Sequence, residues 1–183
     1  MSRMWVCVAM LLATAGTASL AQSPAEGRVA IGLELFPRLL ALDVELEQKR
    51  STDGSLRVWV VYSSQSREAD RCADVLRRKA AMIRGTRTTF SVSSVADLVS
   101  AVSPPTAILI VEPIPAGDRE RVLAYARQHQ RIVFSPFEGD VERGVTAGIF
   151  IGARVQLYFN VRALDASRVR LDPGLLRLSR VYE

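Results

Sequence analysis

The sequence contains few of the residue types that usually build catalytic, metal or cofactor centres. It has two cysteines and one histidine in 183 residues. Two cysteines are too few for a disulfide scaffold, and a single histidine leaves no Cys/His set of the kind that binds zinc. The sequence also has no phosphate-binding loop, no dinucleotide-binding glycine motif and no nucleophile elbow. We therefore expect a protein that is not an enzyme and that uses neither a cofactor nor a metal ion.

The sequence also has no apolar run long enough to cross a bilayer. Its apolar N-terminal run, Met4–Ala15, follows Arg3 and leads to small residues that end at Ala21, a pattern typical of a cleaved signal peptide. We predict a signal peptide at 1–21 and a single domain at 22–183, located in the periplasm without an integral membrane segment. The net charge of +5 and the pI of about 9.8 would suit nucleic acid, but export makes that partner improbable.

Hydrophobic periodicity in the remaining chain alternates between strands and helices. The expected strands 56–62 and 106–111 are continuously apolar, as expected for strands buried on both faces, and the other two are weaker or shorter. The expected strands are 56–62, 86–92, 106–111 and 131–134, and the expected helices are 28–49, 66–83, 94–102 and 117–130. This order predicts a three-layer α/β domain with a mostly parallel sheet of five to six strands and helices on both faces. A C-terminal strand pair at 148–152 and 155–160, followed by a helix at 175–181, completes the expected domain.

Cys72 is the only cysteine outside the predicted signal peptide. It lies at helical spacing with Ala69, Leu76, Ala80 and Ile83, which places it on a buried helix face. We expect no disulfide within the chain. A homodimer linked through Cys72 stays open only if this thiol is exposed.

The candidate ligand-binding residues lie in loops that follow the expected parallel strands, where open α/β sheets bind their ligands. Ser64, Ser66 and Arg67 form a hydroxyl-rich turn at a helix start, which could bind an anion or simply cap the helix. Glu112 and Glu138 follow two further strands, and together with Asp140 they could converge as carboxylates, although no ligand spacing supports a metal site.

The candidate partner-binding residues are two arginines near the C-terminus. Arg177 and Arg180 would share one face of the expected final helix, since they are three positions apart. They form either a solvated face or a contact for an acidic partner.

The last fifty residues or so of the sequence resemble the YfiR-like family of exported bacterial proteins. The resemblance is carried by an ordered set of short patterns rather than by one motif. In order, these are 132–145 (IVFSPFEGDVERGV), the glycine-containing strand 147–151 (AGIFI), the strand 154–160 (RVQLYFN), Ala163-Leu164, and the closing segment 175–181 (LLRLSRV).

This resemblance implies a periplasmic regulatory protein without enzymatic activity. The best-known relative restrains a membrane-bound diguanylate cyclase by binding its periplasmic sensor region, and others accompany sensor kinases or receptors. That relative has paired cysteines that respond to oxidation, whereas Cys72 stands alone here. The alternative function is a periplasmic module that binds a small anionic ligand, with Ser64, Ser66 and Arg67 lining its pocket.

Overall fold

The computed structural model describes residues 23–183, so the predicted signal peptide lies outside the described residues. One eight-stranded sheet runs through the described part in the order β2-β3-β1-β4-β5-β6-β7-β8. Its strands are β1 (Leu56–Tyr62), β2 (Met82–Ile83), β3 (Thr86–Ser94), β4 (Ala107–Ile110), β5 (Ile132–Ser135), β6 (Ala147–Ile151), β7 (Val155–Asn160) and β8 (Arg180–Tyr182).

Five neighbouring strands, β3-β1-β4-β5-β6, are parallel, which is the strand order of a doubly wound α/β sheet. The apolar strands β1 and β4 occupy its centre, as their continuous hydrophobic character predicts. β6 and β7 form an antiparallel hairpin, and β8 then pairs in parallel with β7. The α/β class and the mostly parallel sheet are confirmed, but the sheet has eight strands rather than five to six.

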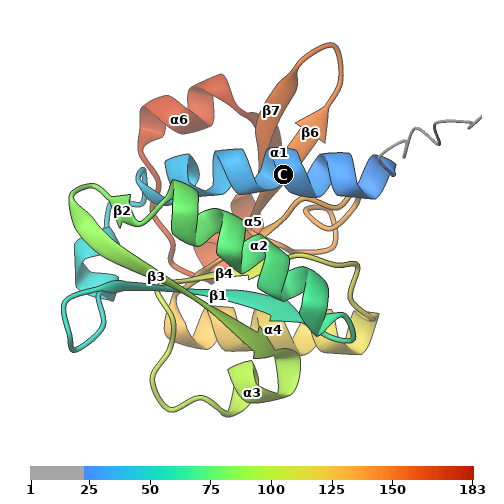
Figure 1. Cartoon of the computed structure of the whole chain (residues 1–183). Helices are drawn as coiled ribbons and strands as arrows, with labels where there is room; N and C mark the ends of the chain where they lie inside the picture. Colours follow the sequence, from blue (N-terminus) through green and yellow to red (C-terminus); the bar gives the residue numbers. More distant parts are fainter. Residues whose placement is uncertain (1–22) are drawn as a thin grey trace, which may run out of the picture.

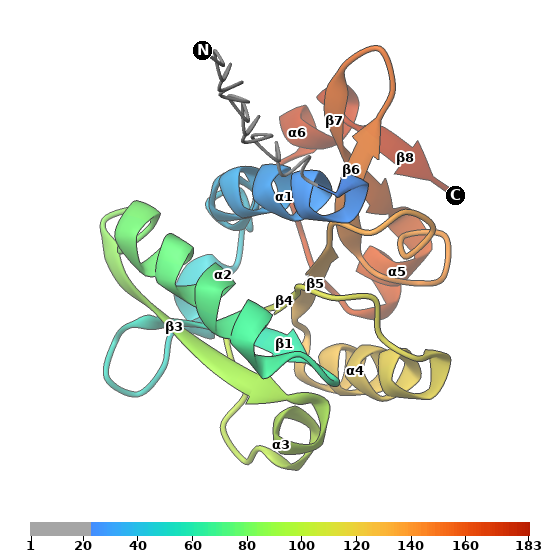
Figure 2. The ribbon, with the colours of Figure 1, turned by 45° about the vertical axis from the view of Figure 1, so that its right-hand side comes forward.

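Helices cover both faces of this sheet (Figures 1 and 2). α1 (Pro24–Leu40), α2 (Ser66–Lys79) and α6 (Pro173–Leu178) lie over one face, where they pack on a large apolar cluster that includes Phe36, Leu76 and Phe134. α3 (Val95–Ser100) and α4 (Ala116–His129) cover the other face with a smaller cluster. The short helix α5 (Val161–Ala166) follows β7. Because β1, β4 and β5 are parallel neighbours, the loops that follow them lie along one edge of the sheet.

The first helix is shorter than the expected helix at 28–49. α1 starts at a capping box between Ser23 and Glu26 and ends at Leu40, soon after Pro37. A turn and the 3-10 helix η1 (Leu46–Lys49) follow it. The reason is a buried ion pair: Lys49 Nζ donates to Asp43 Oδ2 at 2.6 Å, and this contact needs a turn rather than a continuing helix.

The expected final helix at 175–181 is wrong in its second half. α6 ends at Leu178, and the chain then becomes extended to form β8. Pairing with β7, about twenty residues earlier, outweighs the helical periodicity of this segment. The other strand that periodicity missed, β2, has only two residues and pairs with the start of β3. In place of the expected helical stripe to residue 83, Ile83 is buried on this hairpin.

Among the described residues, none of the helices combines the length and apolar character needed to cross a membrane.

Candidate functional site

The carboxyl edge of the parallel sheet is held together by one buried carboxylate. Glu112, which follows β4, is 3% exposed. Its Oε1 accepts hydrogen bonds from the backbone N–H groups of Ser63 and Ser64, both at 2.6 Å, and its Oε2 accepts from Gln65 N–H at 3.0 Å. The Ser64 hydroxyl lies 3.4 and 3.3 Å from the two carboxylate oxygens. The loop before α2 is therefore an anion-binding nest that the protein fills with its own side chain.

This geometry changes the interpretation of the predicted serine turn. Ser64 and Glu112 do come together, but the helix-capping role fails because the N-cap of α2 is Gln65, whose side chain makes no capping hydrogen bond. Ser66 and Arg67 are exposed and line an open hollow beside the nest. An external anion could reach the three N–H groups only by displacing Glu112.

The expected convergence of carboxylates does not occur. Asp140 is buried and accepts from the Ser135 hydroxyl at 2.5 Å and from Arg143 Nη2 at 3.0 Å. The Glu138 side chain is 92% exposed and faces Arg28 rather than Glu112. Within residues 23–183, no three His, Cys, Asp or Glu side chains are arranged to hold a metal ion.

A hollow of about 220 Å³ lies on the outer side of the nest, between the N-terminal ends of α1 and α2. Its polar lining is mostly acidic, since Glu26, Glu68 and Glu112 contribute to it, and Val29 and Phe137 supply apolar surface. This combination suits an ammonium group attached to an apolar body better than it suits an anion.

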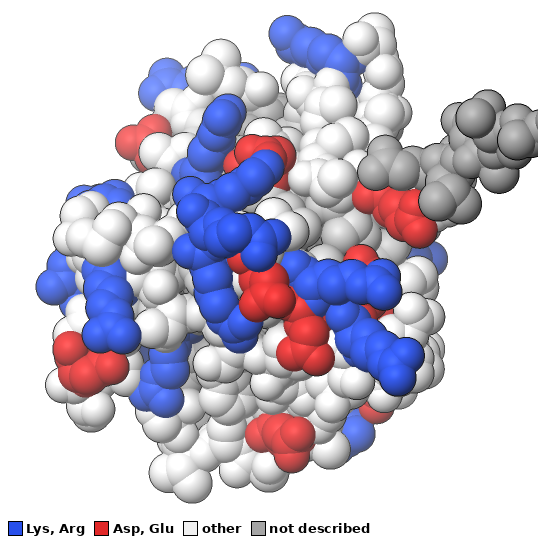
Figure 3. Space-filling model, in the orientation of Figure 1, with Lys and Arg blue, Asp and Glu red and all other residues white. Residues whose placement is uncertain are grey.

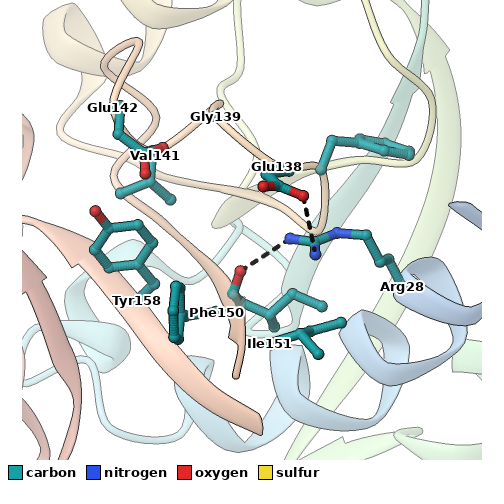
Figure 4. Close-up of a pocket in the computed structure, with 10 residues that line it drawn as sticks. Arg28, Glu138, Gly139, Val141, Glu142, Phe150, Ile151 and Tyr158 are labelled. Atoms are coloured by element: carbon teal, nitrogen blue, oxygen red, sulfur yellow. Dashed lines mark hydrogen bonds and ion pairs between the residues drawn. The ribbon is translucent and has the colours of Figure 1, made fainter. Parts of the chain in front are cut away.

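A second, smaller cavity of about 70 Å³ lies between α1, the loop after β5 and the β6–β7 hairpin (Figure 4). Arg28, which the sequence did not single out, spans it: its Nε donates to the Pro136 carbonyl at 2.7 Å and its Nη2 to the Ile149 carbonyl at 3.1 Å. Its Nη1 lies 3.9 Å from Glu138 Oε2. Arg28 therefore ties α1 to two segments more than a hundred residues away.

Tyr158 lines the opposite wall of this cavity beside Glu142 and Phe150 (Figure 4). Burial raises the pKa of the Tyr158 hydroxyl, and the neighbouring Glu142 carboxylate raises it further. The phenol therefore stays protonated well above neutral pH. Alternation along β7 places Tyr158 on the face opposite Leu157 and Phe159. This alternation is the sequence signal that could have identified Tyr158 as a residue of the site.

The two C-terminal arginines do not share a helix face. Arg177 lies on α6, whereas Arg180 begins β8, and its guanidinium carbon sits 3.7 Å from the centre of the Phe150 ring. This distance is that of a cation–π contact. Arg180 is therefore fixed against the β6–β7 hairpin, and Arg177 is separate from it.

The C-terminal part of the fold carries much of the exposed apolar surface. Of nine large hydrophobic side chains that are exposed in the described chain, five belong to the segment from β6 onward: Ile151, Val155, Leu178, Val181 and Tyr182. Leu178 is 81% exposed, and every residue of β8 is exposed at the edge of the sheet. We call this surface the C-terminal edge.

Cys72 is buried, as its helical spacing predicts, and is 2% exposed. Burial raises its pKa to about 12, with a smaller contribution from Glu68. An intermolecular disulfide through Cys72 is therefore disfavoured in the folded protein.

Comparisons with solved structures find the same fold in longer proteins. A conserved domain protein from Vibrio cholerae O1 biovar El Tor superposes with a TM-score of 0.54 at 17% identity, over 75% of this chain and 60% of that one. An ABC domain from Streptococcus pneumoniae in complex with L-Trp gives 0.52 at 15% identity, over 79% and 60%. This chain thus spans about 60% of the length of these two neighbours. No family model and no curated protein matches the sequence.

Proposed function

We propose that this protein is an exported, non-enzymatic regulator that binds the periplasmic part of a membrane signalling protein, a diguanylate cyclase or a sensor kinase. The observation that carries the proposal is the C-terminal edge, where exposed apolar residues gather around β8, which pairs with β7 on one side and is the outermost strand of the described sheet on the other. Exposed apolar patches and free strand edges are common contact sites for other proteins.

Two further observations support this function. The N–H groups of the 63–65 loop, where an anionic ligand would bind, are already paired with Glu112. The segment that forms the C-terminal edge is also part of the resemblance to the YfiR-like family. That resemblance suggests a partner that belongs to membrane signalling.

Photocrosslinking from defined positions tests this proposal. A photoreactive amino acid would replace Leu178 or Tyr182 in the cell, and Val102 would serve as the control because it is 98% exposed but lies in the loop before β4. We expect one membrane signalling protein to be captured from positions 178 and 182 and not from 102. Equal capture from all three positions, or no capture from 178 and 182, would contradict the proposal.

A small-molecule binding module is the second candidate function. The acidic and apolar hollow of about 220 Å³ favours it, and one structural neighbour is described as an L-Trp complex. Because this lining is acidic, the ligand expected here carries an ammonium group instead of the anionic group that the sequence suggested. L-tryptophan should then raise the melting temperature, whereas indole-3-propionate, which lacks the amine, should not. No shift with either compound would count against this candidate.

A further inference from the structure

The opposite edge of the sheet carries a surface of a different kind. It is built on the hairpin of β2 and β3, the end of α2 and the turn after α1. We call it the basic edge, and it comprises Arg38, Leu42, Val44, Arg78, Lys79, Met82, Arg84 and Arg87.

The hairpin fixes which of these side chains face outward. Met82 pairs with Arg87, and Ile83 pairs with Thr86. Ile83 and Thr86 are buried, so Met82 and Arg87 project together from the outer face, and Met82 is 59% exposed. The tight turn at Arg84 and Gly85, both with positive φ, locks this register.

The turn after α1 adds further apolar surface beside the hairpin. Arg84 Nη1 donates to the Asp43 carbonyl at 3.5 Å, which joins the hairpin to this turn. The residues on either side of Asp43 are exposed, Leu42 at 37% and Val44 at 52%. The turn also forms backbone hydrogen bonds with the segment before α6, from Val44 N–H to the Arg170 carbonyl at 2.9 Å and from Asp172 N–H to the Leu42 carbonyl at 3.0 Å. The exposed apolar side chains of the basic edge therefore lie on the hairpin and on the turn that the hairpin contacts.

Positive charge surrounds these apolar side chains with little compensation. No acidic residue occurs between Asp74 and Asp97, a stretch that contains five basic ones. Lys79 pairs with Glu34, and the pKa of Glu34 is lowered by Lys79 and, to a smaller extent, by Arg38. Within residues 23–183, none of the observed ion pairs involves Arg38, Arg78, Arg84 or Arg87. Figure 3 shows basic side chains over the α2 side of the molecule, with acidic side chains among them.

We infer that the basic edge docks on an anionic phospholipid bilayer. A bilayer interface accepts apolar side chains at the depth of the headgroups while anionic headgroups surround them, and this matches Met82, Leu42 and Val44 beside the arginines of the basic edge. Arginine side chains can keep their charge among the headgroups while their stems lie along apolar surface. An acidic protein would use the charge, but it would not account for apolar side chains at the tip of a basic hairpin.

A vesicle-binding assay tests this inference. It uses the protein recovered after export, and mass spectrometry identifies the N-terminus of that protein. Vesicles of phosphatidylglycerol and phosphatidylethanolamine should sediment the protein, and phosphatidylcholine vesicles should not. The variant Arg78→Glu plus Arg87→Glu should bind more than about tenfold more weakly, since each basic residue near an anionic surface contributes to the attraction and each glutamate is repelled by it. High salt should weaken binding as well.

The matched control is Arg127→Glu plus Arg162→Glu, which changes the net charge equally on α4 and α5. Arg78 and Arg127 both lie in the last turn of a helix, so the two variants perturb helix ends alike. The control should retain most of the binding. Equal loss in both variants, or unchanged binding of the first, would overturn the inference.

Tryptophan probes separate lipid insertion from electrostatic contact alone. Tryptophan at position 82 should show blue-shifted emission with anionic vesicles, whereas tryptophan at the exposed position 102 should not. Both Met82→Trp and Val102→Trp would be made in a Trp59→Phe background. No shift at position 82 would overturn apolar docking and leave an acidic protein as the partner for the basic edge. Because no signalling protein is present, these outcomes are independent of the proposed regulatory function.

Discussion

Glu112 accepts hydrogen bonds from backbone groups that precede it by 47 to 49 residues, so its role depends on the tertiary fold. From the sequence, Glu112 and the 63–67 turn were both candidates for the same edge, because both follow parallel strands. The sequence could not show that one would fill the other. That outcome depends on whether the Glu112 side chain reaches from the end of β4 to the loop after the neighbouring strand β1.

Substitution of Glu112 tests this role. Glu112→Gln places an amide nitrogen against backbone N–H donors, so we expect the free energy of unfolding to fall by about 1.5–3 kcal/mol. Urea denaturation followed by circular dichroism would measure this change. Glu120→Gln, at an exposed position on α4, should stay within about 0.5 kcal/mol of the parent protein. Equal stability of the two variants would show that Glu112 is dispensable.

The buried Cys72 thiol predicts a specific pH dependence. An ordinary cysteine ionises near pH 9, whereas burial raises the pKa of Cys72 to about 12, so the folded protein keeps the unreactive thiol at pH 9. Iodoacetamide should therefore modify Cys72 slowly at pH 9 and rapidly after unfolding in guanidinium chloride. By the same linkage, the thiol's contribution to stability is complete below pH 9 and declines as pH rises towards 12. Rapid modification of the folded protein would contradict the burial.

At the scale of elements, α1 is positioned by a close contact with the sheet. A Cβ added at Gly32 would lie 2.9 Å from Cβ of Pro136 and 3.2 Å from the Phe134 ring. Gly32→Ala should therefore push α1 away from β5 and destabilise the protein by about 1–3 kcal/mol, measured as a lower urea midpoint.

The same helix offers the control. Gly27 has open space around the position of an added Cβ, so Gly27→Ala should stabilise α1 by up to about 1 kcal/mol. A loss of stability in both variants would indicate a general effect of alanine in this helix rather than the contact of residue 32.

The elements that periodicity predicted well are those whose own sequence determines their burial. β1 and β4 are continuously apolar, and α4 and the face of α2 that carries Cys72 repeat at helical spacing. The misplaced segments depend on distant partners. Residues 41–49 turn because Asp43 and Lys49 pair in the interior, and β8 is extended because β7 offers it an edge.

At the scale of the whole molecule, alternating strands and helices were sufficient to predict a three-layer, mostly parallel sheet. They could not predict which surfaces would stay uncovered, because exposure depends on where each strand lies in the sheet. The strand order answers this: β2 and β8 are the two outermost strands, so the hairpin of the basic edge and the strand of the C-terminal edge lie at opposite ends of one sheet.

This strand order also sets the distance between the two outermost strands. Neighbouring strands are spaced by about 4.8 Å, so the seven intervals between β2 and β8 correspond to roughly 34 Å along the hydrogen-bonding direction. With β2 on a bilayer, β8 would lie at most about that far from the lipid surface, so a partner bound at β8 would be contacted away from the membrane. The number of strands in the sheet would then set the distance from the membrane at which the proposed partner is bound.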